Sequence, residues 1–129
     1  MKTTLRTTVL LIIGALVGAG VSGVVKAQRK PPVYAIIDIS ETMDAQAYIK
    51  AVSASEPNAT QSVGGRFLIR TNKAIPLDGA APPNRFVVIA FSSEEQAKSW
   101  YSSPPISKIN SVRMKVTKSR AFLVEGLAN

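Results

Sequence analysis

The residues of this chain that could do chemistry are arginines, tyrosines, one tryptophan and scattered carboxylates. The sequence contains no histidine and no cysteine. Serine–histidine–aspartate triads, thiol nucleophiles, cysteine or histidine zinc sites and histidine-ligated haem are therefore excluded for this chain. Proton transfer at neutral pH would need an aspartate, glutamate, lysine or tyrosine with a perturbed pKa. We expect neither a metal ion nor a cofactor.

Four arginines at predicted strand ends or on the last predicted helix are candidate ligand-binding residues. They are Arg66, Arg85, Arg113 and Arg120. A guanidinium group binds planar anions through parallel N–H groups, so this set could hold a carboxylate or an enolate. The alternative is that these arginines form ordinary ion pairs with Asp38, Asp78 and Glu125. We favour the ion pairs, because scattered arginines often pair on a protein surface.

Three aromatic residues and one carboxylate complete the candidate site. Trp100 and Tyr101 could stack on a planar ligand, although packing is the commoner fate of a tryptophan on a helix stripe. Tyr34 and Tyr101 are better site candidates, because a buried hydroxyl needs a partner. Asp38 interrupts an apolar strand, so it is either ion-paired or a base with a raised pKa, and we favour the ion pair. The catalytic candidates are therefore Asp38, Tyr34 and Tyr101.

The elements that must position these residues follow the order strand, helix, strand, strand, helix, strand. The predicted strands are residues 33–39, 66–70, 85–91 and 119–125. Short β-branched and aromatic runs between Gly, Pro, Asn and Ser are typical of strands. This order predicts an α+β fold of the ferredoxin-like βαββαβ type, an antiparallel sheet with its helices on one face.

Capping residues and one proline predict where the helices begin and end. Asp44 is a suitable N-cap for the first helix, and Pro57 should break that helix. The apolar stripe of the first helix contains Ala45, Tyr48, Ile49 and Val52. Ser93 and Gln96 form a capping box at the start of the later helix.

Two details of the sheet follow from alternation and from proline. In the second strand, alternation places Phe67 and Ile69 on the same face. Residues 74–77 could add a short edge strand, because Pro76 is tolerated at a sheet edge but not inside a sheet.

The first and third predicted strands are apolar on both faces. Tyr34 and Ile36 face away from the other apolar residues of the first strand, and Phe86 and Val88 do the same in the third. In a sheet with one solvent-exposed face, apolar and polar residues should instead alternate along each strand. An exposed face of this kind would form an unusually large apolar patch for a monomer. We expect a homodimer that packs the two open sheet faces about a two-fold axis, with clefts between sheet and helices for a small ligand.

The beginning of the chain has the pattern of a secretory signal. A basic start is followed by an uncharged apolar segment, residues 7–25, and by small residues around Ala27. We expect a signal peptide over residues 1–27, an exported periplasmic or secreted protein, and one domain over residues 28–129. The alternative is an inner-membrane anchor formed by residues 7–25, since about 20 apolar residues can span a bilayer.

The formal net charge of +8 does not indicate nucleic-acid binding. The basic residues are scattered, whereas non-specific nucleic-acid binding needs a concentrated stripe. We expect a solvated basic surface, no nucleic-acid partner, and no membrane contact after cleavage of the signal.

Several short motifs of the chain resemble the domain of unknown function 1330 family. They are Val33-Tyr34-Ala35, Asp44 with Tyr48, Gly64-Gly65-Arg66-Phe67-Leu68, Leu77-Asp78-Gly79, Arg85-Phe86-Val87-Val88-Ile89, Phe91-Ser92-Ser93, Trp100-Tyr101-Ser102-Ser103-Pro104, Arg113, and Ser119-Arg120 through Val124-Glu125-Gly126. The resemblance implies a ferredoxin-like dimeric α+β barrel, and similar barrels include cofactor-free monooxygenases, isomerases and chains without known activity. The chain departs from the family pattern at Ala90, where a Glu is frequent, and at Ile106, where a Tyr is frequent.

These observations lead to three interpretations of function. The favoured one is an exported homodimer that binds a small, anionic organic molecule in a cleft. The first alternative is a cofactor-independent monooxygenase-like or isomerase-like enzyme, in which Asp38 or a tyrosine moves a proton and the arginines hold an enolate. The second alternative is a membrane-tethered interaction module.

Overall fold

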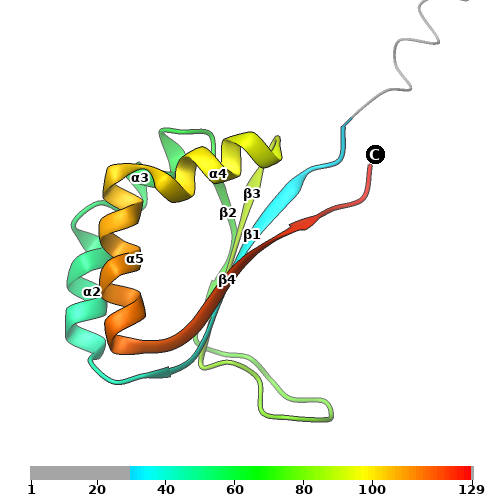
Figure 1. Cartoon of the computed structure of the whole chain (residues 1–129). Helices are drawn as coiled ribbons and strands as arrows, with labels where there is room; N and C mark the ends of the chain where they lie inside the picture. Colours follow the sequence, from blue (N-terminus) through cyan, green and yellow to red (C-terminus); the bar gives the residue numbers. More distant parts are fainter. Residues whose placement is uncertain (1–29, 129) are drawn as a thin grey trace, which may run out of the picture. The chain divides into compact units, whose positions relative to one another are not determined.

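The computed structural model of the chain describes residues 30–128 (Figure 1). The predicted signal or anchor, residues 1–27, lies outside these described residues and stays a prediction. Residues Pro31–Ala128 form a single unit. None of the helices between residues 30 and 128 has both the length and the hydropathy that a bilayer crossing requires.

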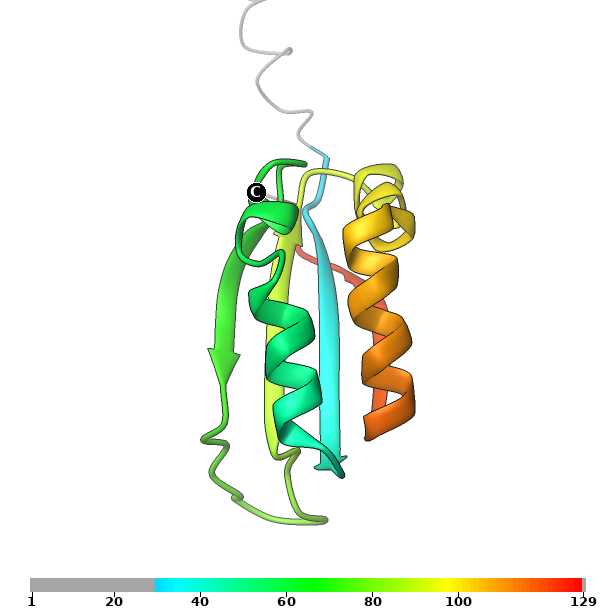
Figure 2. The same ribbon diagram turned by 90° about the vertical axis from the view of Figure 1, so that its left-hand side faces the viewer.

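Four strands form one antiparallel sheet, and the helices cover one of its faces. The elements are β1 (Val33–Thr42), α2 (Ala45–Ser53), α3 (Asn58–Gln61), β2 (Arg66–Thr71), β3 (Arg85–Phe91), α4 (Glu94–Ser102), α5 (Pro104–Val116) and β4 (Thr117–Glu125). The strand order is β2-β3-β1-β4, and every neighbouring pair is antiparallel. Figure 2 shows α2 and α5 side by side in front of the sheet. The predicted ferredoxin-like α+β fold is confirmed.

The core lies between the sheet and the helices. Ala35 of β1 is paired with Ile89 of β3, and both are buried beneath the helix layer. Trp100 of α4 packs on Phe91, with the two ring centroids 5.1 Å apart. Burying these side chains is the main favourable term for folding, at roughly 25 cal/mol per Å² of apolar surface.

A β-bulge in β2 changes which of its side chains face the helices. The register shifts between Phe67 and Ile69, so that Phe67 lies opposite Ile89 and Ile69 lies opposite Val88. The prediction that Phe67 and Ile69 share a face is therefore wrong, because one extra residue interrupts the alternation. The bulge also brings Arg70 to the helix-covered face, where its guanidinium lies 5.0 Å from the centre of the Phe67 ring.

The helix ends follow the predicted caps with one difference. Asp44 accepts a hydrogen bond from the backbone N–H of Ala47 at 3.0 Å, and Ser93 accepts one from that of Gln96 at 3.1 Å. The Gln96 side chain accepts from the N–H of Ser92, one residue earlier than in a standard capping box. Ile49, predicted on the apolar stripe of α2, is instead 63% exposed.

The connection between β2 and β3, residues 72–84, contains no strand. The predicted edge strand over residues 74–77 is wrong, because Pro76 removes a backbone donor and this segment runs beyond the end of the sheet. Figure 1 shows the connection bending to the side of the sheet that faces away from the helices. Ile75 is 73% exposed and Leu77 is 98% exposed.

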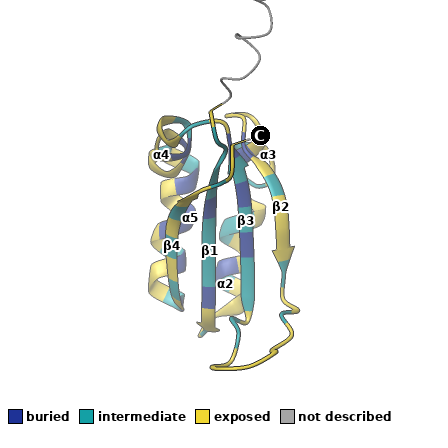
Figure 3. Ribbon diagram, turned by 90° about the vertical axis from the view of Figure 1, so that its right-hand side faces the viewer, coloured by how far each residue is buried: buried dark blue, intermediate teal, exposed yellow. Residues whose placement is uncertain are grey.

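Figure 3 shows the open face of the sheet. The register places apolar side chains of all four strands on this face. Ile36 of β1 lies between Val88 of β3 and Phe122 of β4 in the register, and Ile69 of β2 lies opposite Val88. Phe122 and Ile69 are 39% and 44% exposed. The predicted apolar open face is therefore present in this fold.

Candidate functional site

A cavity lined by polar side chains lies between the helix layer and the β2–β3 half of the sheet. The polar residues that line it are Tyr48, Glu56, Thr60, Arg70, Arg85 and Asn110. Its volume is about 50 Å³, and Phe67, Ile89 and Trp100 supply apolar wall. An outer pocket of about 340 Å³ shares Tyr48, Glu56, Arg70 and Arg85 with it. The same four side chains therefore separate the inner cavity from the outer pocket.

Each polar side chain reaches the cavity from a different element. Tyr48 comes from the buried face of α2, and Glu56 comes from the turn before Pro57. Arg85 is the first residue of β3, and Asn110 lies on the buried face of α5. The bulge in β2 supplies Arg70, as described above. The site therefore exists only once the sheet and both helices have packed.

Three side chains at the cavity share a pattern: one polar atom of each is held by the protein and another is not. Glu56 Oε1 accepts from Thr60 Oγ1 at 2.7 Å, and Arg85 Nη1 donates to Asn72 Oδ1 at 2.9 Å. Asn110 Oδ1 accepts from Arg113 Nε at 3.4 Å. The remaining atoms, Glu56 Oε2, Arg85 Nε and Asn110 Nδ2, are buried and have no hydrogen-bond partner within the described part of the chain.

This arrangement is unusual, because buried polar atoms in native proteins nearly always have a partner. The cost of leaving one unsatisfied is about 1–3 kcal/mol. Two donors and one acceptor of this kind line a single cavity. The cavity is thus suited to a small molecule that accepts two hydrogen bonds and donates one.

Tyr48 adds a third donor. Burial raises the pKa of Tyr48 above its usual value of 10.0, and the positive charges of Arg85 and Arg113 offset this only in part. The carboxylate of Glu56 also raises this pKa. The phenol is therefore protonated at neutral pH, so that it can donate a hydrogen bond and does not act as an anionic base.

Arg113 is a buried cation beside this site. It is 2% exposed, and Nη1 donates to Ser119 Oγ at 2.7 Å while Nε holds Asn110. The ion pairs formed between residues 30 and 128 do not include it. A buried charge without a counter-ion is costly, so Arg113 contributes a positive potential that favours an anion nearby. It is a positioning residue, because it acts on the cavity through Asn110.

The structure brings only part of the predicted site together. Arg85 lines the cavity, Arg113 lies behind Asn110, and Trp100 forms a wall. Trp100 is 4% exposed, and its indole N–H donates to Thr60 Oγ1 at 3.0 Å. The indole is therefore held in place by the protein, as the packing interpretation requires.

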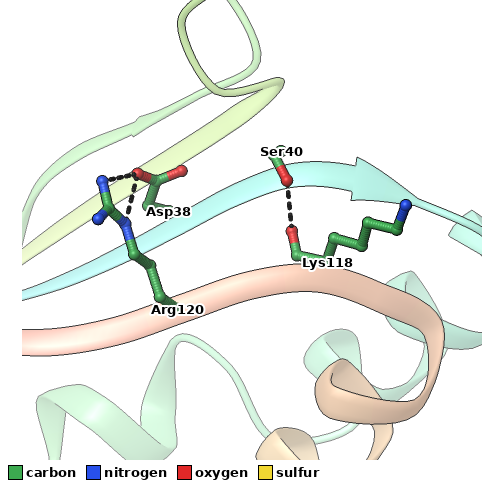
Figure 4. A network of polar contacts seen from close by, with 4 residues as sticks. All are labelled: Asp38, Ser40, Lys118 and Arg120. Carbon is green, nitrogen blue, oxygen red and sulfur yellow. Dashed lines mark hydrogen bonds and ion pairs between the residues drawn. The ribbon is translucent and has the colours of Figure 1, made fainter.

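The other predicted residues lie elsewhere. Asp38 and Arg120 form an ion pair on the open face, with Arg120 Nη2 and Nε at 3.0 Å and 3.1 Å from Asp38 Oδ2 (Figure 4). The ion-pair interpretation of Asp38 is confirmed. Tyr34 and Arg66 are also on the open face, since both lie opposite Ala90 in the register. The ion pairs of the described residues include neither Asp78 nor Glu125.

Tyr101 belongs to a second, more apolar cavity of about 250 Å³ between α4 and strands β1 and β4. Three alanines, Ala35, Ala97 and Ala121, leave this space open, and Tyr101 is 40% exposed at its edge. Trp100 and Ile37 line both cavities, so they form the partition between them.

Sequence reasoning missed five polar residues of the cavity: Tyr48 as a functional group, Glu56, Thr60, Arg70 and Asn110. The signals were weak but present. Glu56 and Thr60 are four residues apart around a helix break, and Asn110 follows the apolar Ile109 on a buried stripe. Of the two departures from the family pattern, Ile106 lines the polar cavity, whereas Ala90 faces away from it on the open face.

Comparisons with known proteins agree with this architecture. A protein of unknown function from Rhodopseudomonas palustris is 12% identical, with a TM-score of 0.60 over 85% of this chain and 94% of that chain. A putative antibiotic biosynthesis monooxygenase from Nitrosomonas europaea is 16% identical, with a TM-score of 0.52 over 78% and 93%. SnoaB, a cofactor-independent oxygenase from Streptomyces nogalater, is 16% identical, with a TM-score of 0.50 over 77% and 96%.

At these identities the solved structures establish the shared fold and nothing about activity. No curated protein matches the chain. The model of the family described as Domain of unknown function (DUF1330) matches residues 32–127, which include every strand and helix described above. The chain therefore belongs to the DUF1330 family.

Proposed function

We propose that this protein binds a small organic acid or enol at the polar cavity beneath α2 and α5, with the polar end of the ligand at the inner cavity and the rest of the ligand in the outer pocket of about 340 Å³. The observation that carries the proposal is the convergence of three buried, unpartnered polar atoms on one cavity. Arg85 Nε and Asn110 Nδ2 would donate to an oxygen of the ligand, and a hydroxyl of the ligand would donate to Glu56 Oε2. A molecule with a hydroxyl group beside a carboxylate or carbonyl group satisfies all three.

The charges around the cavity support a ligand oxygen with negative character. Arg70 and Arg85 line the cavity and Arg113 lies behind it, whereas Glu56 is the carboxylate of its lining. A charge-assisted hydrogen bond from a guanidinium to an anionic oxygen is about twice as strong as a neutral one. The protonated phenol of Tyr48 adds a neutral donor, and Ile49, Val52 and Pro57 offer apolar surface in the outer pocket to the rest of the molecule.

The proposed assembly is an exported homodimer joined through the open sheet faces. The apolar residues on β1, β2, β3 and β4 support this arrangement, because a second copy would cover the whole face at once about a two-fold axis. Export rests on the signal-like pattern of residues 1–27.

A titration with three probes tests the binding proposal. Salicylate carries a hydroxyl beside a carboxylate, benzoate lacks the hydroxyl, and phenol lacks the carboxylate. We expect salicylate to bind most tightly and to shift the NMR signals of the Asn110 side-chain amide. Arg85→Gln should weaken binding about tenfold or more, as the loss of a charged hydrogen bond implies. Arg66→Gln, on the open face, is the matched control. Salicylate binding that leaves the Asn110 amide unmoved, or no binding of any probe at millimolar concentration, would contradict the proposal.

One observation favours a second function, an isomerase-like enzyme. The free oxygen of Glu56 lies in the same cavity as donors that could hold an enolate. Glu56 would take the proton from the carbon next to a ligand carbonyl, and the C–H electron pair would move to form an enolate held by Arg85 and Asn110. In a ligand with a double bond between the β- and γ-carbons, return of the proton to the γ-carbon moves the double bond to the α- and β-carbons and completes an isomerisation without an oxidant.

Exchange of the α-protons of phenylpyruvate in deuterated water distinguishes the enzyme from the binder. Catalysis predicts that the purified chain speeds up this exchange and that Glu56→Gln abolishes the increase, whereas the open-face variant Arg66→Gln keeps it. Equal exchange rates for the wild type and Glu56→Gln would refute the enzymatic role and leave the binding proposal standing.

A further inference from the structure

The connection between β2 and β3, residues 72–84, forms an arm with two strongly exposed apolar side chains. Leu77 is 98% exposed and Ile75 is 73% exposed. At Gly79 the backbone has a φ of +74°, and no atom beyond its two neighbouring residues lies within 4 Å of where a Cβ would be. Apolar side chains that are this exposed gain little from burial within their own fold. Their position is explained if another surface covers them.

The arm and the open face of the sheet belong to one continuous surface. Ala81 and Pro83, at the end of the arm, line a shallow pocket together with Asp38 and Arg120 of the open face. Figure 1 shows the arm bending to the side of the sheet away from the helices. A molecule bound to the open face would therefore lie next to the arm.

We propose that the arm of each protomer clasps the second copy of the chain that covers the open face. The proposal rests on the proposed homodimer and adds to it a contact that the sheet alone does not provide. In a two-fold dimer every contact occurs twice, so that two arms would grip the assembly from opposite sides. Burying Ile75 and Leu77 in this way removes the exposed apolar side chains from water.

The composition of the arm favours a copy of this chain over a membrane or nucleic acid. Its charged residues are Lys73 and Asp78, one of each sign. Recognition of an anionic lipid surface or of nucleic acid relies on clustered lysine and arginine. The arm has no net charge, and in the open face beside it Arg120 is paired with Asp38. This balance of charge instead matches an interface between like surfaces. The same apolar face is present on the second copy by definition.

A single thiol makes the contact directly testable, because the chain contains no cysteine. The Leu77→Cys variant is prepared both unlabelled and ¹⁵N-labelled, and each form is coupled to a benzophenone maleimide. The two forms are mixed, left until their subunits have exchanged, and irradiated. We expect cross-linked peptides of mixed isotope composition, which arise only between two chains. Met114→Cys is the matched control, because Met114 is 63% exposed on α5 on the opposite side of the sheet. Cross-links that are exclusively within one chain, or no more abundant than those of the control, overturn the proposal.

Sedimentation equilibrium separates failure of the arm from failure of the dimer. The pair Ile75→Ser and Leu77→Ser should raise the dimer Kd about tenfold or more, whereas Met114→Ser should change it by less than about twofold. If the wild type is a dimer and the double variant has the same dimer Kd, the contact made by the arm is refuted and the homodimer stands. A wild-type chain that remains monomeric at micromolar concentration refutes both.

Discussion

The hydrogen-bonded chain Trp100–Thr60–Glu56 offers the sharpest test of how the cavity is built. Thr60 is fully buried, and its hydroxyl accepts from the Trp100 indole N–H at 3.0 Å and donates to Glu56 Oε1 at 2.7 Å. Thr60→Val replaces this hydroxyl by a methyl group and keeps the branched shape of the side chain. The change therefore removes two hydrogen bonds and leaves the volume of the core almost unaltered.

The expected cost follows from what the substitution leaves behind. The buried indole N–H loses its partner, which costs about 1–3 kcal/mol, and the carboxylate loses one charge-assisted hydrogen bond. The two losses share one hydroxyl and are not additive, so we expect the free energy of unfolding to fall by about 2–3 kcal/mol. For a domain of roughly 100 residues this corresponds to a fall in Tm of about 8 °C or more.

Urea unfolding, followed by the fluorescence of the single tryptophan and by circular dichroism, measures this difference. Thr42→Val is the matched control, because Thr42 lies at the end of β1 and its hydroxyl makes no hydrogen bond to the described residues. The control should change the free energy of unfolding by less than about 0.5 kcal/mol. If Thr60→Val were as mild as the control, the hydrogen-bonded chain would not be what holds Glu56 and Trp100 in place.

Three further predictions concern the wall of the cavity and its surroundings. Because burial raises the pKa of Tyr48, the folded state binds this proton more tightly than the unfolded chain. The stability that the neutral phenol contributes should be complete below pH 10 and lost as the pH rises through the pKa of Tyr48 in the folded state. Urea titrations across this pH range should show the loss in the wild type, and Tyr48→Phe should lack it. Gly65→Ala should lower the free energy of unfolding by about 1–3 kcal/mol, because the new Cβ would lie 2.6 Å from Thr60 Cγ2 and 3.0 Å from the Thr60 carbonyl oxygen; an unchanged Tm would contradict this. Arg120→Gln should cost less than about 1 kcal/mol and leave salicylate affinity unaltered, because Arg120 is 73% exposed and its ion pair lies on the open face.

Local signals in the sequence were sufficient for the fold. Residues 86–91 are an unbroken apolar run that follows Asn84 and Arg85 and precedes Ser92, and β3 spans Arg85–Phe91. Asp44 and Ser93 cap the helices that they were expected to cap. Such signals act over a few residues, so they can be recognised without knowledge of the tertiary structure.

The errors arose where long-range pairing decides the outcome. The bulge near Leu68 depends on how β2 aligns with β3, and alternation within β2 alone contains no trace of it. For the same reason, the partners of Glu56 and Asn110 could not be predicted. Their cavity is formed by packing α2 and α5 onto the sheet, and only Arg85, Arg113 and Trp100 were identified in advance from residue type.

The bulge in β2 makes the cavity sensitive to chain length in an unexpected way. Leu68 is the surplus residue of the strand, and Arg70 faces the helices because of it. A chain shortened by that one leucine would alternate regularly from Phe67 onward and would still present its arginine to the same side. Deleting Leu68 is therefore the milder change in this strand. Regular pairing of β2 without the bulge and without the deletion would place the Arg70 guanidinium on the opposite face of the sheet.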